Sequence, residues 1–262
     1  LNAGYQALML PVSGDIDLEV QKNIRSGVAD GYWIGNSMIG SHTLEELTRR
    51  KLPVITYVAD TRIQEPLPGI DTVTMALEPG FQQMFNQIVR LGFRSYIRFQ
   101  AAGNSSGSHR DQLLTEMAAA HALRLENSVS FSATLFSESQ LRLAAYRAAK
   151  THLDEFVRCG LVLCGNDVTA LGLCDALTDA GLRPGRDLSL IGFDNLEENP
   201  NFAAPHPILS TIETHLETIG KTLAERLLER ISGNGEIVSG ALSIPTTFLR
   251  RESLNTPSGV RR

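Results

Sequence analysis

Apolar residues along the chain follow two different spacings. Compact apolar runs recur between turn-forming segments, and such runs are typical of strands that are buried in a sheet. Longer segments place an apolar residue at every third or fourth position, which is the spacing of an amphipathic helix. The compact runs predict strands at 7–11, 32–34, 54–58, 72–75, 95–99, 128–136 (with a loop), 160–164, 188–191 and 241–250. The periodic segments predict helices at 15–26, 41–52, 81–91, 110–123, 139–153, 169–180 and 214–231.

Strand and helix segments alternate along the whole sequence, which predicts an α/β fold with mainly parallel sheets. A proline-punctuated loop at 61–71 interrupts the alternation and predicts two such units. Pro245 lacks a backbone donor, so we expect the last strand to be interrupted or to lie at a sheet edge. Thr43, followed by Glu46 in the next turn, predicts a capping box at the start of the second helix.

The stretch 181–195, Gly-Leu-Arg-Pro-Gly-Arg-Asp-Leu-Ser-Leu-Ile-Gly-Phe-Asp-Asn, combines a helix stop, a turn, a strand and a polar strand end. Gly181 suits the left-handed residue that follows a helix, and Pro184-Gly185 is turn chemistry. Asp194 and Asn195 come directly after the predicted strand 188–191. Ligands of open parallel sheets bind beyond the carboxyl ends of the strands, so this end is the first candidate for a binding edge.

Composition excludes several classes of protein. The chain has 262 residues, 42% hydrophobic and 20% charged, with a net charge of -5. Such a mildly acidic chain is by itself a poor nucleic-acid binder, because phosphate contacts need a basic face. No apolar run is long enough to cross a bilayer, and the first residues lack the basic start and apolar core of a signal peptide. Three cysteines, an odd number without zinc or disulfide spacing, predict buried thiols and a cytoplasmic location.

Polar side chains follow other predicted strands as well. Asn36 follows strand 32–34, Asn166 and Asp167 follow strand 160–164, and Arg110 begins the helix after strand 95–99. Arg110 offers a planar fork of donors, Asp194 accepts protons from hydroxyl groups, and Asn166 has both donors and acceptors. This set suits a polyhydroxylated ligand or a nucleoside.

Other interpretations of these residues remain open. Asp167 is equally well explained as a helix N-cap, and Arg110 as a solvated residue of a first helical turn. The Gly/Ser loop at 102–109 lacks both the Gly-Lys-Ser/Thr ending and the GxGxxG spacing of phosphate-binding loops. The histidines are scattered without metal-ligand spacing, and no nucleophile motif is present. We therefore predict no cofactor, no metal and no catalytic residues.

Several of these segments together resemble the effector-binding core of LacI/GalR-type bacterial transcription regulators. The resemblance rests on 181–195, on Pro-Ile-Leu-Ser-Thr-Ile at 207–212 and on Pro-Thr-Thr-Phe-Leu-Arg-Arg-Glu-Ser at 245–253. Upstream, Asn-Asp-Val-Thr-Ala-Leu-Gly at 166–172 is similar to a further family motif, and Ser-His-Arg at 108–110 falls at the family's ligand-contacting arginine. The resemblance covers nearly the whole chain.

The resemblance implies two Rossmann-like subdomains of periplasmic-binding-protein type, joined by three crossovers, with a small ligand between them. By analogy the N-terminal subdomain spans 1–77 and 214–242, the C-terminal subdomain spans 78–213 and 243–254, and 255–262 is a tail. The implied partners are a small effector such as a sugar, a second copy in a homodimer, and operator DNA. The sequence contains no helix-turn-helix, so the DNA would be bound through a headpiece absent from it. The aromatic residue that stacks on the family's ligand aligns with Leu135, and Phe136 lies next to it.

Two other functions compete with a regulator's sensor. A solute-binding protein of a transporter shares the fold but needs an export signal, which is not visible here. An enzyme would need a catalytic base or a nucleotide loop, and the sequence shows neither. The site that we predict therefore consists of Arg110, Asn166, Asp167 and Asp194, with Leu135, Phe136 and Asn36, and it performs no chemistry on its ligand.

Overall fold

The computed structural model describes residues 4–10, 14–35, 39–58, 70–102, 109–133, 137–199, 202, 206–233 and 241–256. Contacts between Cα atoms divide the chain into two compact units. The first unit comprises Leu1–Ala76 and His215–Ile244, and the second comprises Leu77–Thr214 and Pro245–Arg262. The chain therefore passes from one unit to the other three times. The exact subdomain bounds that the resemblance implies stay a prediction.

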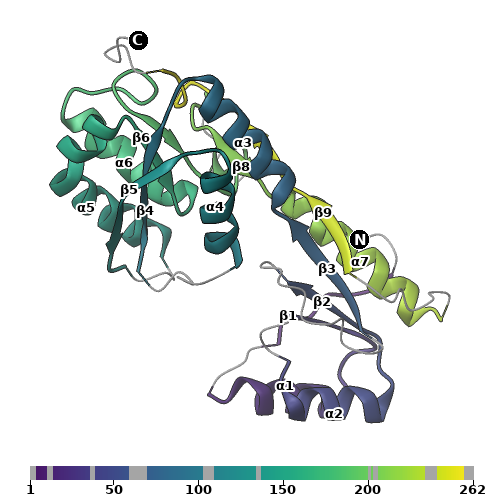
Figure 1. The fold of residues 1–262 in the computed structure, drawn as a ribbon. Helices are drawn as coiled ribbons and strands as arrows, with labels where there is room; N and C mark the ends of the chain where they lie inside the picture. Colours follow the sequence, from purple (N-terminus) through teal and green to yellow (C-terminus); the bar gives the residue numbers. More distant parts are fainter. Residues whose placement is uncertain are drawn as a thin grey trace. The chain divides into compact units, whose positions relative to one another are not determined.

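The first unit is a sheet between two layers of helices (Figure 1). Its strands follow the order β1-β2-β3-β9, and β1, β2 and β3 pair in parallel. Helices α1 and α2 share an apolar cluster with β1 and β2, whereas α7 packs on β2 and β3. The strands are β1 (Tyr32–Gly35), β2 (Val54–Val58), β3 (Asp71–Ala76) and β9 (Ala241–Pro245), and the helices are α1 (Ile16–Ser26), α2 (Ser41–Arg50) and α7 (Leu216–Ile231).

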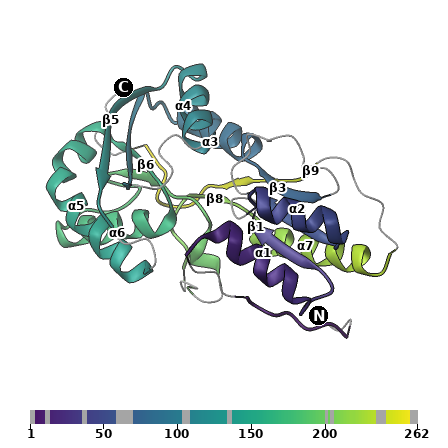
Figure 2. The same cartoon turned by 90° about the horizontal axis from the view of Figure 1, so that it is seen from below.

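Helices α1 and α2 lie side by side, and α1 supplies the cap of α2 (Figure 2). The Asp17 carboxylate in the first turn of α1 accepts three backbone N–H groups at the start of α2, from Gly40, His42 and Thr43, at 2.9–3.1 Å. Partial burial raises the pKa of Asp17, but the hydrogen bonds from Thr43 and His42 outweigh it and hold this pKa well below its usual range. A carboxylate from a neighbouring helix thus satisfies donors that a local cap usually takes.

The predicted capping box at Thr43 is therefore wrong. The helix already begins at Ser41, and Thr43 is a buried residue inside it whose hydroxyl donates to the Asp17 carbonyl. Glu46 does not reach back to the helix start. It binds Arg49, Arg25 and Arg50 at the C-terminal ends of both helices, and these arginines lower its pKa to about 2.

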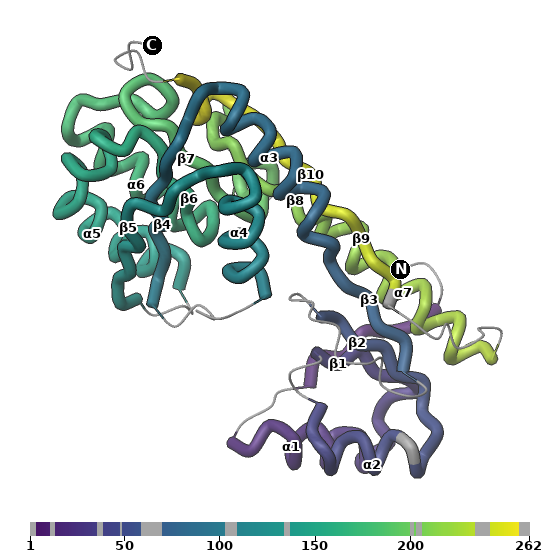
Figure 3. The backbone as a smooth tube through the Cα atoms, viewed as in Figure 1, coloured from purple at the N-terminus to yellow at the C-terminus, as the bar shows by residue number. Residues whose placement is uncertain are grey.

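The second unit is built on a parallel sheet with the order β5-β4-β6-β7. Helices α5 and α6 cover one face through the main apolar core, and α3 and α4 lie on the other face (Figure 1). A two-stranded antiparallel ribbon of β8 and β10 lies beside α3 (Figure 3). The strands are β4 (Ser95–Ala101), β5 (Arg124–Phe131), β6 (Leu161–Cys164), β7 (Ser189–Ile191), β8 (Thr211–Glu213) and β10 (Thr247–Leu249), and the helices are α3 (Glu78–Arg90), α4 (His109–Ala120), α5 (Glu138–Cys159) and α6 (Asp167–Asp179), with a 3-10 turn at Leu196–Glu198.

The interruption that we predicted for the last strand is confirmed. The segment 241–250 forms β9 and β10, with Thr246 between them. Thr246 is buried, and its hydroxyl donates to the Leu77 carbonyl and accepts the Gly80 N–H, both at 3.3 Å. A Cβ on Gly80 would lie 2.5 Å from this hydroxyl oxygen, so the glycine permits the close contact.

The apolar pattern gave wrong predictions where burial depends on neighbouring elements. Residues 7–10 are described and form no strand, because no described strand pairs with them, and Met9 is 94% exposed. Strand β1 exists, but Trp33 is 61% exposed because β1 lies at an edge of the sheet. Helix α5 runs on past 153 to Cys159, where Gly160 with a φ of 83° ends it.

Candidate functional site

The strands β4, β6 and β7 run in parallel, so their carboxyl ends meet at one edge of the second unit's sheet. Four of the predicted site residues lie in the segments that follow these strands. They are Arg110 in the first turn of α4, Asn166 and Asp167 at the start of α6, and Asp194 after β7.

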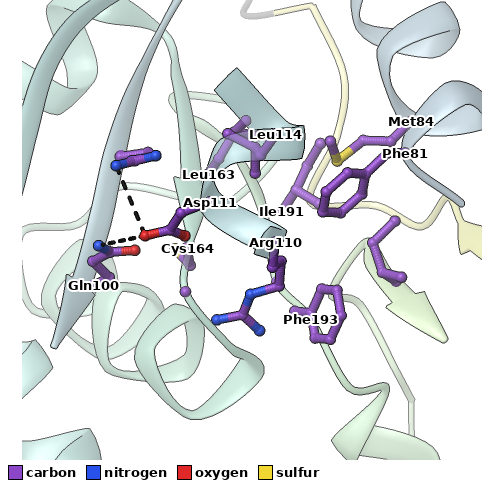
Figure 4. A pocket seen from close by; sticks show the side chains of 14 residues that line it. Phe81, Met84, Gln100, Arg110, Asp111, Leu114, Leu163, Cys164, Ile191 and Phe193 are labelled. Carbon is purple, nitrogen blue, oxygen red and sulfur yellow. Dashed lines mark hydrogen bonds and ion pairs between the residues drawn. The ribbon is translucent and has the colours of Figure 1, made fainter. Parts of the chain in front are cut away.

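Arg110 lies over the ring of Phe193, with 4.6 Å between its guanidinium carbon and the ring centroid (Figure 4). This distance is within the range of a cation–π interaction. Phe193 is 6% exposed and meets Phe81 of α3 edge to face, with 6.4 Å between the ring centroids. Phe81 packs against Phe193 and holds its ring in place, and the Phe193 ring in turn orients the Arg110 guanidinium.

Asp194 has a strained backbone and an electrostatic link to Arg110. Its φ is 106° and that of Asn195 is 57°, so two consecutive residues other than glycine lie in the left-handed region. The Asp194 N–H donates to the Ile212 carbonyl at 2.9 Å, which helps to hold this conformation. Such strain clusters at binding sites.

Burial raises the pKa of Asp194 to about 6, the charge of Arg110 partly offsets this, and Glu213 raises it further.

Asn166 and Asp167 both make hydrogen bonds within the unit. The Asn166 side chain accepts the Thr169 N–H at 2.9 Å and is the N-cap of α6, so the cap that we considered for Asp167 belongs to its neighbour. Asp167 is fully buried, and its two oxygens accept the Thr211 hydroxyl and the Leu196 N–H, each at 2.7 Å. Burial raises the pKa of Asp167 to about 7, although these hydrogen bonds lower it. We infer that Asp167 stabilises the carboxyl edge of the sheet through these hydrogen bonds and does not contact a ligand.

The remaining predicted site residues, Asn36, Leu135 and Phe136, lie outside the described residues. Asn36 belongs to the sequence of the first unit, and the other two precede α5 in the second. Their part in the site stays a prediction.

A small pocket lies between α4 and the sheet, next to Arg110 (Figure 4). The pocket is partly open, and a water-sized sphere can occupy about 30 Å³ of it, which is room for about one water molecule and far less than a sugar needs. Its polar lining comes from Arg98, Gln100, Arg110 and Asp111, and Phe193 also lines it. Of these residues only Arg110 was a predicted site residue, although the arginine within the apolar run 95–99 was a signal that one face of that strand is polar.

The described residues contain no group of three or more His, Cys, Asp or Glu side chains that could hold a metal ion. None of the helices that the structure describes is long and apolar enough to span a membrane.

Two α/β units, between which the chain passes three times, define a protein with the periplasmic-binding-protein architecture, as the family resemblance implied. Residues 85–254 match the periplasmic binding protein-like domain family. This match covers more than half of the sequence, and the chain belongs to that family.

Similar proteins of known type are repressors. The lactose operon repressor of Escherichia coli (strain K12) is 29% identical over 116 residues, which are 44% of this chain and 31% of the repressor. The HTH-type transcriptional repressor PurR of Erwinia tasmaniensis is 33% identical over 114 residues, which are 44% of this chain and 33% of the repressor. The matched stretches span about a third of the length of these relatives.

Solved structures show the same fold. A dimeric Lac repressor with a C-terminal deletion has a TM-score of 0.69 at 20% identity, covering 94% of this chain and 85% of its own. A LacI family transcriptional regulator from Enterococcus faecium, with bound ribose, has a TM-score of 0.69 at 21% identity, covering 90% of this chain and 84% of its own. The predicted resemblance to the core of LacI-type regulators is confirmed by these matches.

Proposed function

We propose that this chain is the effector-sensing part of a cytoplasmic LacI-type transcriptional regulator, and that it binds a small polar ligand such as a sugar. One observation carries the proposal: Arg110 lies over Phe193 beside a strained, half-buried Asp194, at the carboxyl edge of a parallel sheet. The matched repressors and the regulator with bound ribose support it.

The chemistry of this edge suits a polyhydroxylated ligand. The guanidinium of Arg110 offers several donors in one plane, and the Asp194 carboxylate accepts hydroxyl protons above a pH of about 6. Phe193 fixes the plane of Arg110, which reduces the conformational entropy that binding would otherwise lose. None of the described groups at this edge is arranged as a nucleophile with its base, so we propose binding without catalysis.

The regulatory step follows from linkage. An effector changes operator affinity only if it binds one conformational state more tightly than the other. We propose a homodimer that binds operator DNA through a helix-turn-helix headpiece outside this sequence, as the family resemblance implies. The alternative, a solute-binding protein of a transporter, shares the fold, but the two relatives described above are repressors.

A thermal-shift screen of sugars and nucleosides would test the proposal, because a ligand that binds the native state raises its apparent stability. The ligand that it finds would then be titrated by calorimetry into wild type, Arg110→Ala and Asp194→Asn. We expect both variants to weaken binding at least about tenfold, as the loss of a charge-assisted hydrogen bond predicts. Arg158→Ala, which removes an exposed arginine on α5, is the matched control. Unchanged affinity in both site variants would overturn the assignment.

A further inference from the structure

Strand β4 carries charge and polarity on the face that α4 covers. Ile97, Phe99 and Ala101 of this strand belong to the apolar core under α5 and α6. The residues between them, Arg98 and Gln100, therefore point to the opposite face of the sheet. A buried arginine or glutamine on a central strand is unfavourable unless a neighbouring element supplies partners.

Helix α4 supplies these partners. The Gln100 amide donates to the Asp111 carboxylate at 3.4 Å, and Arg98 forms an ion pair with the same carboxylate at 3.9 Å. Arg98 also donates to the Thr115 hydroxyl at 3.3 Å, one turn further along the helix. Gln100 is 6% exposed and Asp111 is 8% exposed, so this polar cluster lies within the fold.

Helix α4 has few fully buried apolar side chains. Its buried residues are Asp111, Leu113 and Ala118, and Leu114 and Met117 are half-buried. The space between α4 and the sheet includes the water-sized pocket. The contacts of Asp111 with Arg98 and Gln100 therefore add to the apolar packing in fixing where the first turn of α4 lies.

That first turn carries Arg110, directly before Asp111. Successive side chains of a helix point about 100° apart, so a helix whose Asp111 is anchored to the sheet presents Arg110 in a different, fixed direction. Figure 4 shows this divergence: Asp111 points to Gln100, whereas Arg110 extends in another direction and lies beside Phe193. A rotation of the helix that broke the first contact would also move Arg110 from the ring.

We propose that Arg98 and Asp111, with Gln100, are positioning residues that hold Arg110 in its ligand-binding orientation without contacting the ligand themselves. The inference rests on the proposed function for its meaning, but the positioning itself is measurable without any ligand. Phenylglyoxal reacts with accessible guanidinium groups, and iodoacetamide reacts with accessible thiols. Cys164, which lines the pocket beneath α4, is buried at 8% exposure, so it becomes accessible to the reagent only when α4 moves.

The test compares wild type with Asp111→Asn and Arg98→Met, using peptide-resolved mass spectrometry after treatment with each reagent. We expect Arg110 to react with phenylglyoxal, and Cys164 with iodoacetamide, about three- to tenfold faster in both variants, the factor that one lost hydrogen bond gives. The rate at Arg158 should not change. Arg98→Lys, which keeps the charge, should restore most of the wild-type protection.

Hydrogen exchange separates positioning from a general loss of stability. We expect faster exchange of α4 amides in the variants and unchanged exchange in α5 and α6, whereas a destabilised unit would exchange faster in all three helices. Unchanged reactivity of Arg110 in a folded Asp111→Asn or Arg98→Met protein would overturn the proposal, as would uniform acceleration. A panel of sugars that all fail to bind wild type would defeat the proposed function alone, and equal sugar affinity in wild type and variants would defeat the positioning role alone.

Discussion

The replacement Asp167→Asn tests how the buried carboxyl at the start of α6 is held. Asp167 is fully buried and accepts two hydrogen bonds, from Thr211 and Leu196. Its oxygen also packs on the backbone at Gly192, where an added Cβ would lie 1.9 Å away. Asparagine has nearly the same shape but does not titrate, and its amide nitrogen cannot accept a hydrogen bond. The loss of that hydrogen bond does not depend on pH, so the pH-dependent part of the difference between the two proteins reports the ionisation of Asp167.

The magnitude follows from the raised pKa. An aspartate in the unfolded chain has a pKa of about 3.9, and in the folded protein burial raises the pKa of Asp167 to about 7. Between these values only the folded state holds the proton, so wild-type stability falls as pH rises through this window. Each pH unit is worth about 1.4 kcal/mol, and the interval from pH 5 to pH 7 therefore amounts to roughly 2–3 kcal/mol. The asparagine variant lacks this loss.

The assay is urea denaturation of both proteins at pH 5, 6, 7 and 8, followed by circular dichroism. Fluorescence of Trp33, the single tryptophan, identifies the transition of the first unit and allows it to be separated from that of the second. Titrations that both proteins share cancel in the difference of their unfolding free energies. We expect this difference to shift by about 2 kcal/mol in favour of Asp167→Asn between pH 5 and pH 8.

Asp154→Asn, an exposed replacement on α5, serves as the control and should show no such trend. A difference between wild type and Asp167→Asn that stays level across this pH range, or moves in favour of wild type, would refute the reasoning. It would mean that the hydrogen bonds from Thr211 and Leu196 outweigh the burial of the charge.

Three further predictions concern two glycines of the second unit, the cap of α2 and the pH dependence of ligand binding. Gly181 and Gly185 both have a positive φ, but only at Gly185 would an added Cβ lie 1.8 Å from a backbone oxygen. In urea denaturation we therefore expect Gly181→Ala to lower the free energy of unfolding by about 1–2 kcal/mol and Gly185→Ala to lower it clearly more. Asp17→Ala should lower the stability of the first unit by about 1–2 kcal/mol through loss of the α2 cap, measured by Trp33 fluorescence, and an unchanged midpoint would contradict this. The affinity for a sugar found by the screen should fall by up to about tenfold per pH unit below pH 6, as Asp194 becomes protonated, and Asp194→Asn should abolish that dependence.

Local patterns predicted much of the second unit. Gly181, which follows the apolar-periodic segment of α6, has the left-handed φ of 71° that a helix stop requires. The strand after it forms, and Asp194 follows at the carboxyl edge of the sheet. These features depend on residues within one turn or one strand, so the sequence is sufficient to predict them.

The errors arose where a partner lies far away in the sequence. Thr43 looked like a cap because the capping Asp17 belongs to another helix. The Phe193 ring that supports Arg110 is separated from it by three strands and two helices, and no local spacing predicts that they meet. The burial of Asp167 was not predictable either, because Thr211, which donates to its carboxylate, lies in β8, a strand that the apolar pattern did not predict.

The second unit depends on the last described part of the chain, which has a consequence for synthesis on the ribosome. Ser253 is fully buried, accepts the Ser210 N–H at 2.7 Å and donates to the Leu190 carbonyl at 2.7 Å. The first unit likewise needs α7, which begins at Leu216. During synthesis the first unit therefore lacks α7 and β9 until residues 216–244 emerge, and a premature stop codon before Ser253 leaves the buried Ser210 N–H without its partner.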